Sequence, residues 1–249
     1  MVILKLPEEI EKARASNKIV AEVLARLREK VKPGVTTKEL DKFAEDIAEK
    51  RGAKPAFKGY RGYPYSLCTS VNEEVVHGMP STRVLKEGDI IGLDFGVLYK
   101  GFFGDATITL PVGKVAENAL KLMAVTEQSL YAGIEQAIEG NRLGDISAAV
   151  QQTVEAAGFS VVRDFVGHGI GRNLHEEPQI PNYGKTGRGI ELKSGMVFAI
   201  EPMVNEGDYR VRVLSDGWTV ATEDGKLSAH FEHSVAITDN GPAILSKLS

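Results

Sequence analysis

Two aspartates bracket an apolar run in the segment DFGVLYKGFFGDAT, which spans residues 94–107. A carboxylate that is buried without a partner costs several kcal/mol or more, so it protonates, finds a partner or holds a metal ion. Besides Asp94 and Asp105, two further acids stand in apolar surroundings, Glu201 in AIEP and Glu232 in HFEHS. Four converging carboxylates repel one another unless they share protons or bind cations. These residues therefore suggest a cation site.

A histidine supplies a candidate nitrogen ligand for the same site. His168 lies in FVGHGIGRNLHEEP, where Gly167, Gly169 and Gly171 allow close backbone approach and leave little room for a helix. Four carboxylates and one imidazole suit a pair of divalent ions. His175 follows seven residues after His168, which is not the HExxH spacing of zinc peptidases, and the glycines do not match a dinucleotide-binding fingerprint.

The spacing of the two aspartates predicts that they share one face of a hairpin. If the chain turns at Lys100-Gly101, then Asp94 faces Thr107 directly and Asp105 is its diagonal neighbour. Diagonal neighbours on one face lie roughly 7 to 8 Å apart, near enough for two carboxylates to hold ions between them. A bulge or a loop of odd length would break this parity.

Helix signals occur twice along the chain. One helix is predicted from Pro7, and a second from about Thr37 to Arg51 after the capping-box pattern Thr36-x-x-Glu39. A second pair is predicted over residues 116–138 and from Asp145, as the N-cap, to Ala157. The two pairs indicate an internal repeat.

The strand signals repeat as well, and the four acids occupy matching positions in the repeated segments. EGDIIGLDF resembles KSGMVFAIEP at a shift of 107 residues, which sets Asp94 on Glu201. GDATITL resembles FEHSVAI at a shift of 127 residues, which sets Asp105 on Glu232. Each half thus contributes two acids on two strands. We expect an α+β fold of two halves related by a pseudo-two-fold axis, with a central, mainly antiparallel sheet covered by helices.

These motifs together resemble those of the type I methionine aminopeptidases, and the match spans nearly the whole chain. The resemblance implies a pita-bread fold in one catalytic domain, residues 1–249, with an internal pseudo-repeat of approximately 7–110 and 116–240. It implies two divalent metal ions, Co, Mn, Fe or Zn, bound by Asp94, Asp105, His168, Glu201 and Glu232. The activity implied is removal of the N-terminal methionine from nascent proteins and peptides, with a preference for a small second residue.

The same resemblance implies catalytic and binding roles for further residues. Glu201 would shuttle a proton to the leaving amine, His175 would hydrogen-bond the scissile carbonyl oxygen, and His77 would contact the peptide beyond its first residue. For both histidines, a purely structural role is the alternative. A pocket for the methionine side chain would be lined by Phe57, Tyr60, Tyr63, Cys68, Leu174 and Trp218, although aromatic residues in such runs are more often plain core.

A monovalent cation is a further implication of the resemblance, near Asn72 and Ser228. The alternative is that Asn72 is a turn residue and that Ser228 supplies an edge-strand hydroxyl. Leu174 stands where bacterial members often carry Phe, so the resemblance does not fix the shape of the pocket there.

Composition limits the partners. A formal charge of -4 and an isoelectric point near 5.8 argue against DNA as a partner held by bulk electrostatics. No window approaches the roughly 18 apolar residues of a membrane span. One cysteine cannot form an internal disulfide, which fits a cytoplasmic protein. We expect a monomer, and if it meets nascent chains at the ribosome, as the family does, the docking surface must lie in the catalytic domain.

Two other functions stay open at this point. One is a proline-directed aminopeptidase or prolidase-like enzyme of the same fold, and the other is a non-catalytic pita-bread module that binds peptides. Prolidases usually carry an extra N-terminal domain, whereas the first helix here is expected at about residue 7. Binding-only relatives typically lose metal ligands, yet all five candidate ligands, four acids and one histidine, are present.

Overall fold

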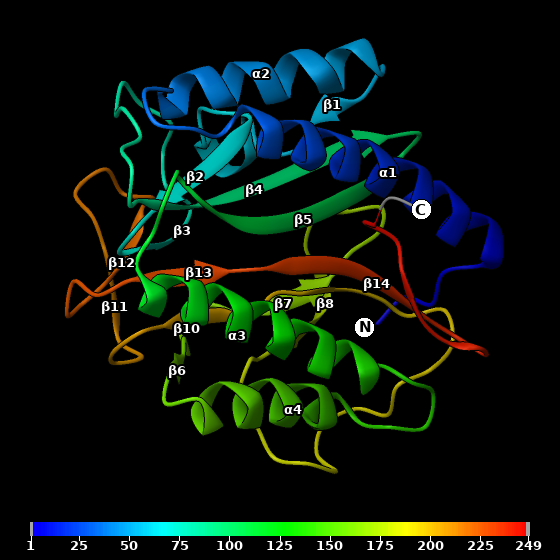
Figure 1. Ribbon diagram of the computed structural model, residues 1–249. Helices are drawn as coiled ribbons and strands as arrows, with labels where there is room; N and C mark the ends of the chain where they lie inside the picture. Colours follow the sequence, from blue (N-terminus) through cyan, green and yellow to red (C-terminus); the bar gives the residue numbers. More distant parts are fainter. Residues whose placement is uncertain (1, 248–249) are drawn as a thin grey trace.

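The computed structural model describes residues 2–247 and contains two pairs of α-helices, with a short 3-10 helix at Tyr60–Gly62. The first pair is α1 (Pro7–Lys30) and α2 (Thr37–Lys50), and the second is α3 (Glu117–Glu135) and α4 (Leu143–Ala156). In Figure 1, α1 and α2 lie together above β4 (Ile90–Tyr99) and β5 (Phe102–Pro111), whereas α3 and α4 lie below β14 (Glu232–Thr238). Within residues 2–247, no helix combines the length and the apolar character needed to cross a membrane.

Strands of both halves join in one nine-stranded sheet, in the order β1-β4-β5-β14-β9-β7-β8, with β2 on β4 and β15 on β14. Every strand pair recorded for the described residues is antiparallel. The predicted α+β fold with a mainly antiparallel central sheet covered by helices is therefore confirmed. The strands are β1 (Lys54–Pro55), β2 (Leu67–Val71), β3 (Glu74–Val76), β4 (Ile90–Tyr99), β5 (Phe102–Pro111), β6 (Ser160–Val161), β7 (Gly167–Gly169), β8 (Glu176–Ile180), β9 (Val197–Ile200), β10 (Met203–Asn205), β11 (Val211–Val213), β12 (Val220–Thr222), β13 (Ser228–His230), β14 (Glu232–Thr238) and β15 (Gly241–Ile244).

Each helix pair has its own hydrophobic core against the sheet. In the first half, buried Leu27 of α1 and Leu40 of α2 pack in one cluster with Leu93 of β4. In the second half, Leu122 of α3 packs in a cluster with Phe198 of β9. Burying an aliphatic or aromatic side chain contributes about 1.5 to 3 kcal/mol, so each half anchors its own strands. The strands then meet where β5 pairs with β14.

Two helix boundaries differ from the prediction by more than one residue. Asp145 is not the N-cap of α4: the N-cap is Arg142, and the Asp145 carboxylate accepts the Arg142 backbone N–H at 2.7 Å from the third helical position. An acid there satisfies a free N–H of the first turn as well as a capping side chain does. Helix α3 ends at Glu135 rather than residue 138, because the N–H groups of Gln136 and Ala137 bond three residues back and close the last turn.

The hairpin prediction is confirmed. Strands β4 and β5 pair without interruption and join at Lys100-Gly101, whose φ angles are +50° and +80°. Positive φ at both central residues is the geometry of tight hairpin turns. Asp94 pairs with Thr107, and Asp105 pairs with Gly96, two positions along the strand from Asp94. The two aspartates therefore lie on the same face.

Helix α1 presses closely on β5 beside Asp105. A Cβ atom added at Gly104 would lie 2.7 Å from the backbone nitrogen of Asn17 in α1. The Asn17 side-chain oxygen accepts the Asp105 backbone N–H at 3.2 Å. Only glycine permits this approach, which fixes the strand that carries Asp105.

We expect Gly104→Ala to lower the free energy of unfolding by about 1 to 3 kcal/mol, because the added methyl group overpacks the helix–strand contact. Gly92→Ala is the matched control on the same hairpin: its Cβ would meet nothing closer than 3.6 Å, an ordinary contact. Urea denaturation of both variants measures the difference. Equal stability of the two variants would contradict the close packing at Gly104.

Candidate metal centre

A cavity of about 190 Å³ opens on the sheet face that carries the predicted acids. Every candidate catalytic, metal-binding and methionine-pocket residue predicted from the sequence lines it: Phe57, Tyr60, Tyr63, Cys68, His77, Asp94, Asp105, His168, Leu174, His175, Glu201, Trp218 and Glu232. The cavity thus brings together residues that lie up to 175 positions apart in the sequence.

The strand order explains how the five candidate ligands meet. Asp94 lies on β4, Asp105 on β5, Glu232 on β14, Glu201 directly after β9, and His168 on β7. These five strands are consecutive in the sheet. Ligand atoms of Asp105, His168 and Glu232 lie within 4.8 Å of one another, and His168 Nε2 lies 3.5 Å from Glu201 Oε1. The five candidate ligands therefore lie on, or directly after, five neighbouring strands of the sheet.

The acids keep buried oxygen atoms without a partner. Asp94 Oδ1, Asp105 Oδ1 and Glu232 Oε1 have no hydrogen-bond partner among the described residues, whereas Glu232 Oε2 accepts the Thr107 hydroxyl at 2.9 Å. Buried polar atoms are almost always paired, so three orphaned carboxylate oxygens on one cavity indicate a missing partner. Hard oxygen ligands with one imidazole fit divalent cations well.

Electrostatics points the same way. Burial raises the pKa of Asp105, Glu201 and Glu232 well above the usual range, and repulsion from neighbouring carboxylates, Asp94 in each case, raises it further. Burial also raises the pKa of Asp94, to about 7. Cations bound between the carboxylates would reverse this shift, because opposite charge favours the ionised form.

His168 is prepared to bind through one nitrogen. Burial lowers its pKa to about 4, so the ring is neutral near pH 7. Its Nδ1 bonds to the Gly169 carbonyl at 2.9 Å, which only accepts, so Nδ1 carries the hydrogen. The Nε2 lone pair is left on the side of Glu201. A neutral imidazole fixed by a bond from its other nitrogen is the usual form of a metal ligand.

His175 lies against both the candidate ligands and the pocket wall. Its ring centroid is 4.2 Å from that of His168, and it stacks on Tyr60 at 5.3 Å. Its Nδ1 lies 2.8 Å from the Tyr60 hydroxyl. When that hydroxyl donates, Nε2 carries the ring hydrogen and is available as a donor. Burial lowers the pKa of His175 to about 3, so it acts as a neutral ring.

Aromatic and sulfur-containing side chains form the wall beside the acids. Tyr63 meets Trp218 edge to face, with ring centroids 5.1 Å apart, and its hydroxyl donates to the carbonyls of Leu67 and Gly78. Cys68 pairs with Asp94 across β2 and β4, and burial raises the pKa of its thiol well above the usual value. A thiol that stays protonated is a packing group rather than a nucleophile.

Sequence reasoning missed further residues of the cavity. Its lining also includes Phe165 and Met203, with Arg61, Val76 and Val166. His230 was given no role, yet its Nε2 lies 3.6 Å from Glu201 Oε2 and has no hydrogen-bond partner among the described residues. The period-two alternation of its strand was the available signal for His230.

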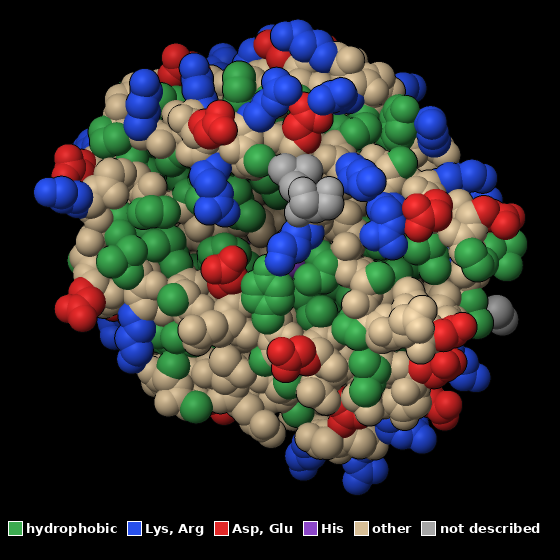
Figure 2. Space-filling model, turned by 45° about the vertical axis from the view of Figure 1, so that its right-hand side comes forward, with side chains coloured by type: hydrophobic (Ala, Val, Ile, Leu, Met, Phe, Trp, Pro, Cys, Tyr) green, Lys and Arg blue, Asp and Glu red, His purple; other side chains and the backbone are tan. Residues whose placement is uncertain are grey.

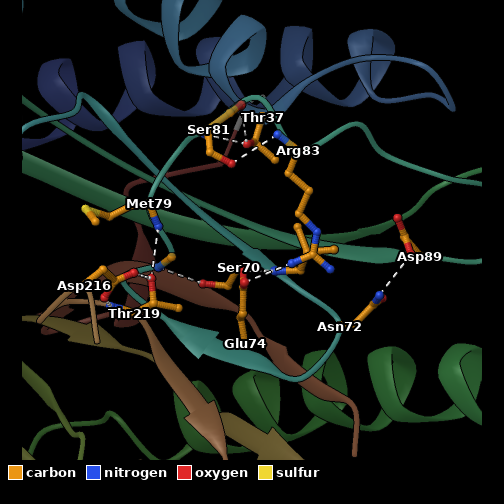
Figure 3. Close-up of polar contacts among 12 residues, drawn as sticks. Thr37, Ser70, Asn72, Glu74, Met79, Ser81, Arg83, Asp89, Asp216 and Thr219 are labelled. Atoms are coloured by element: carbon orange, nitrogen blue, oxygen red, sulfur yellow. Dashed lines mark hydrogen bonds and ion pairs between the residues drawn. The ribbon is translucent and has the colours of Figure 1, made fainter. Parts of the chain in front are cut away.

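Asn72 and Ser228 lie side by side but have protein partners. The Asn72 side-chain amide donates to Asp89 at 2.9 Å (Figure 3), and its carbonyl oxygen accepts the Ile90 N–H. The Ser228 hydroxyl donates to Asn205, and the Ser228 N–H donates to the Asn72 backbone carbonyl. A monovalent cation at this place remains a prediction.

Surface charge is mixed on the face seen in Figure 2, where Lys and Arg side chains are interspersed with Asp and Glu side chains. This pattern matches the small formal net charge of -4.

Comparison with known proteins agrees with this geometry. The model of metallopeptidase family M24 matches residues 11–239. The chain is 58% identical to a methionine aminopeptidase of Clostridium perfringens over 99% of both chains. It is 52% identical to methionine aminopeptidase 1 of Bacillus subtilis over the full length of both. A crystal structure of methionine aminopeptidase from Thermotoga maritima superposes with a TM-score of 0.98, at 51% identity and full coverage of both chains.

A more distant relative shares the fold. Prolidase from Pyrococcus furiosus matches with a TM-score of 0.81 at 24% identity, and the match covers 99% of this chain and 66% of that one. At that identity the likeness concerns the fold alone. The family match over most of the chain and the relatives above 50% identity carry the assignment. The chain belongs to metallopeptidase family M24.

Proposed function

We propose that this chain is a metal-dependent exopeptidase that removes the N-terminal methionine from peptides and nascent proteins, with a preference for a small second residue. The observation that carries this proposal is the set of four carboxylates and one imidazole, with three unpaired buried oxygens, in the lining of a cavity that aromatic side chains also line. The high identity to methionine aminopeptidases along the whole chain supports the choice of substrate.

The proposed metal ligands are Asp94, Asp105, His168, Glu201 and Glu232, which would hold two divalent ions of Co, Mn, Fe or Zn. Such a pair, when bound, lowers the pKa of water and supplies hydroxide at neutral pH for attack on a peptide carbonyl. Side chains of the protein supply the proton transfer and the contacts with the substrate. Glu201, between His168 and His230, is the proposed carrier of a proton toward the leaving amine.

His175 is the proposed donor to the scissile carbonyl oxygen, where negative charge grows in the transition state. Its neutral ring and its bond to Tyr60 support a donating Nε2 at the cavity. His77 is proposed to contact the peptide beyond its first residue. The methionine side chain would lie against Phe57, Tyr60, Tyr63, Cys68, Leu174 and Trp218, an apolar wall that suits a flexible thioether.

Other parts of the proposal go beyond the geometry of the site. They are one catalytic domain with an internal repeat, a monovalent cation near Asn72 and Ser228, a monomeric state, and contact with nascent chains at the ribosome. A cytoplasmic location fits the single cysteine, Cys68, which cannot form an internal disulfide.

The substrate proposal is tested with a Met-Ala-Ser tripeptide. We expect release of methionine that a chelator abolishes and that added Mn²⁺, Fe²⁺ or Co²⁺ restores, measured by chromatography of the products. Ala-Pro-Ser is the matched control peptide. Full activity of metal-free protein would contradict the metal-dependent mechanism. Cleavage of the Xaa-Pro peptide without cleavage of Met-Ala-Ser would select the proline-directed alternative, and cleavage of neither would select a binding module.

The role of His175 is tested by His175→Ala. Loss of one donor to a developing oxyanion lowers kcat by about 10²- to 10³-fold in comparable sites. We expect this loss in steady-state assays with Met-Ala-Ser while the melting temperature changes little. The control is His233→Ala, since His233 is on the other side of the sheet, where it contacts Tyr131 and Ser246. Equal kcat values in the two variants would argue against a transition-state role for His175.

A further inference from the structure

His77 lies in a segment whose backbone has an uncommon conformation. Its φ is +58°, in the left-handed region that residues other than glycine seldom occupy. Gly78 follows, and a Cβ atom added there would lie 2.2 Å from the Thr69 carbonyl oxygen. Such a conformation persists only where surrounding contacts hold it, so these contacts decide where the His77 ring lies.

One set of contacts comes from the side of strand β2. The Thr69 N–H donates to the Gly78 carbonyl at 2.7 Å, and the Tyr63 hydroxyl donates to the same oxygen at 3.1 Å. The Gly78 N–H donates to the Ser70 hydroxyl at 3.3 Å. Both backbone groups of Gly78 are therefore held, which fixes the C-terminal side of His77.

A second set of contacts holds the two ends of residues 71–83, the segment that contains His77 (Figure 3). Glu74 accepts the Val71 N–H at 2.8 Å and an Arg83 guanidinium N–H at 2.9 Å. Four residues after His77, the Ser81 N–H donates to the Thr37 hydroxyl at the start of α2, at 2.8 Å. These contacts join the two ends of residues 71–83 to each other and to α2 in the first half of the fold.

The third contact comes from the second half and passes through one buried hydroxyl. Thr219 is 3% exposed; its hydroxyl accepts the Met79 N–H at 3.4 Å and donates to Asp216 Oδ2 at 2.6 Å (Figure 3). Asp216 Oδ1 also accepts the N–H groups of Trp218 and Thr219, at 2.9 and 2.8 Å. The turn that carries Trp218 is therefore linked to the segment that carries His77 through Thr219.

The two linked segments present neighbouring rings to the cavity. The His77 and Trp218 rings meet edge to face with centroids 6.5 Å apart, and Trp218 meets Tyr63 in the same way. All three side chains line the cavity. A change in the distance between the segments would move one part of this wall away from the other.

We propose that Thr219 is a positioning residue, whose hydroxyl sets the spacing of His77 and Trp218 and so shapes the wall that receives the bound peptide. This inference rests on the proposed function in naming the peptide, but the geometry that it describes is independent of the reaction. It predicts an effect on substrate binding, since Thr219 does not line the cavity itself.

The test variant is Thr219→Val, which keeps the shape of the side chain and both backbone bonds to Asp216 Oδ1 but removes the hydroxyl. We expect KM for Met-Ala-Ser to rise roughly three- to tenfold, the range that the loss of one hydrogen bond produces, with kcat within about twofold. Thr219→Ser keeps the hydroxyl and should restore the original KM. Asp216→Asn, which replaces the acceptor Oδ2 with a donor, should raise KM in the same direction and serves as the second variant.

Tryptophan fluorescence gives a readout that needs no activity. Trp218 is the only tryptophan of the chain, so its emission and anisotropy report directly on this wall. We expect Thr219→Val to lower the anisotropy and shift the emission, and Thr219→Ser to leave both unchanged. Wild-type anisotropy and KM in Thr219→Val would overturn the proposal. If Met-Ala-Ser is not cleaved at all, the proposed function fails, while the fluorescence still decides the role of Thr219.

Discussion

Mutual repulsion among four carboxylates on one cavity is the constraint on which the rest of the structure depends. Asp105 and Glu232 are buried, and Asp94 and Glu201 face the same space. Ionised together and without positive charge, these groups would oppose folding, because each is removed from water beside others of the same sign. Their raised pKa values express that cost. Cations would relieve it, which makes the fold and the proposed activity depend on the same charges.

The sheet holds the carboxylates together where its two halves meet. Strands β5 and β14 share only the pairs Glu232–Thr107 and His233–Ala106, so one of the four acids lies in the junction itself. Thr107 donates to Glu232 across it, and the Ser234 hydroxyl donates to the Asp105 carbonyl. Helix α1 supports the same place through Asn17. The cost of bringing the acids together is thus offset by strands and a helix that are anchored in separate cores.

Much of this arrangement could be predicted from the sequence, for physical reasons that differ from residue to residue. A tight turn at Lys100-Gly101 fixes the register of its hairpin, so the shared face of Asp94 and Asp105 followed from parity alone. The apolar surroundings of the acids, the glycines around His168 and then the resemblance pointed to five candidate ligands, which the sheet does bring together. Local patterns gave the helices but erred at Asp145, since an acid can satisfy a helix start from either of two positions.

The contacts that sequence reasoning missed depend on tertiary structure. Phe165, outside any strand, and Met203, on β10, both line the cavity, and no residue spacing in the sequence predicts this. The link between Met79 and Thr219 likewise joins segments 140 residues apart, and the left-handed backbone of His77 is held by contacts from β2 that no local propensity encodes. Secondary-structure propensity depends on nearby residues, whereas the positions of these side chains depend on the tertiary contacts around them.

The most direct test of the account is a crystal structure of the protein prepared with Mn²⁺, with anomalous scattering recorded at the manganese edge. The account predicts two manganese peaks in the cavity, ligated by Asp94, Asp105, His168, Glu201 and Glu232. An empty cavity with hydrogen bonds among the carboxylates, or metal bound only elsewhere on the protein, would contradict it.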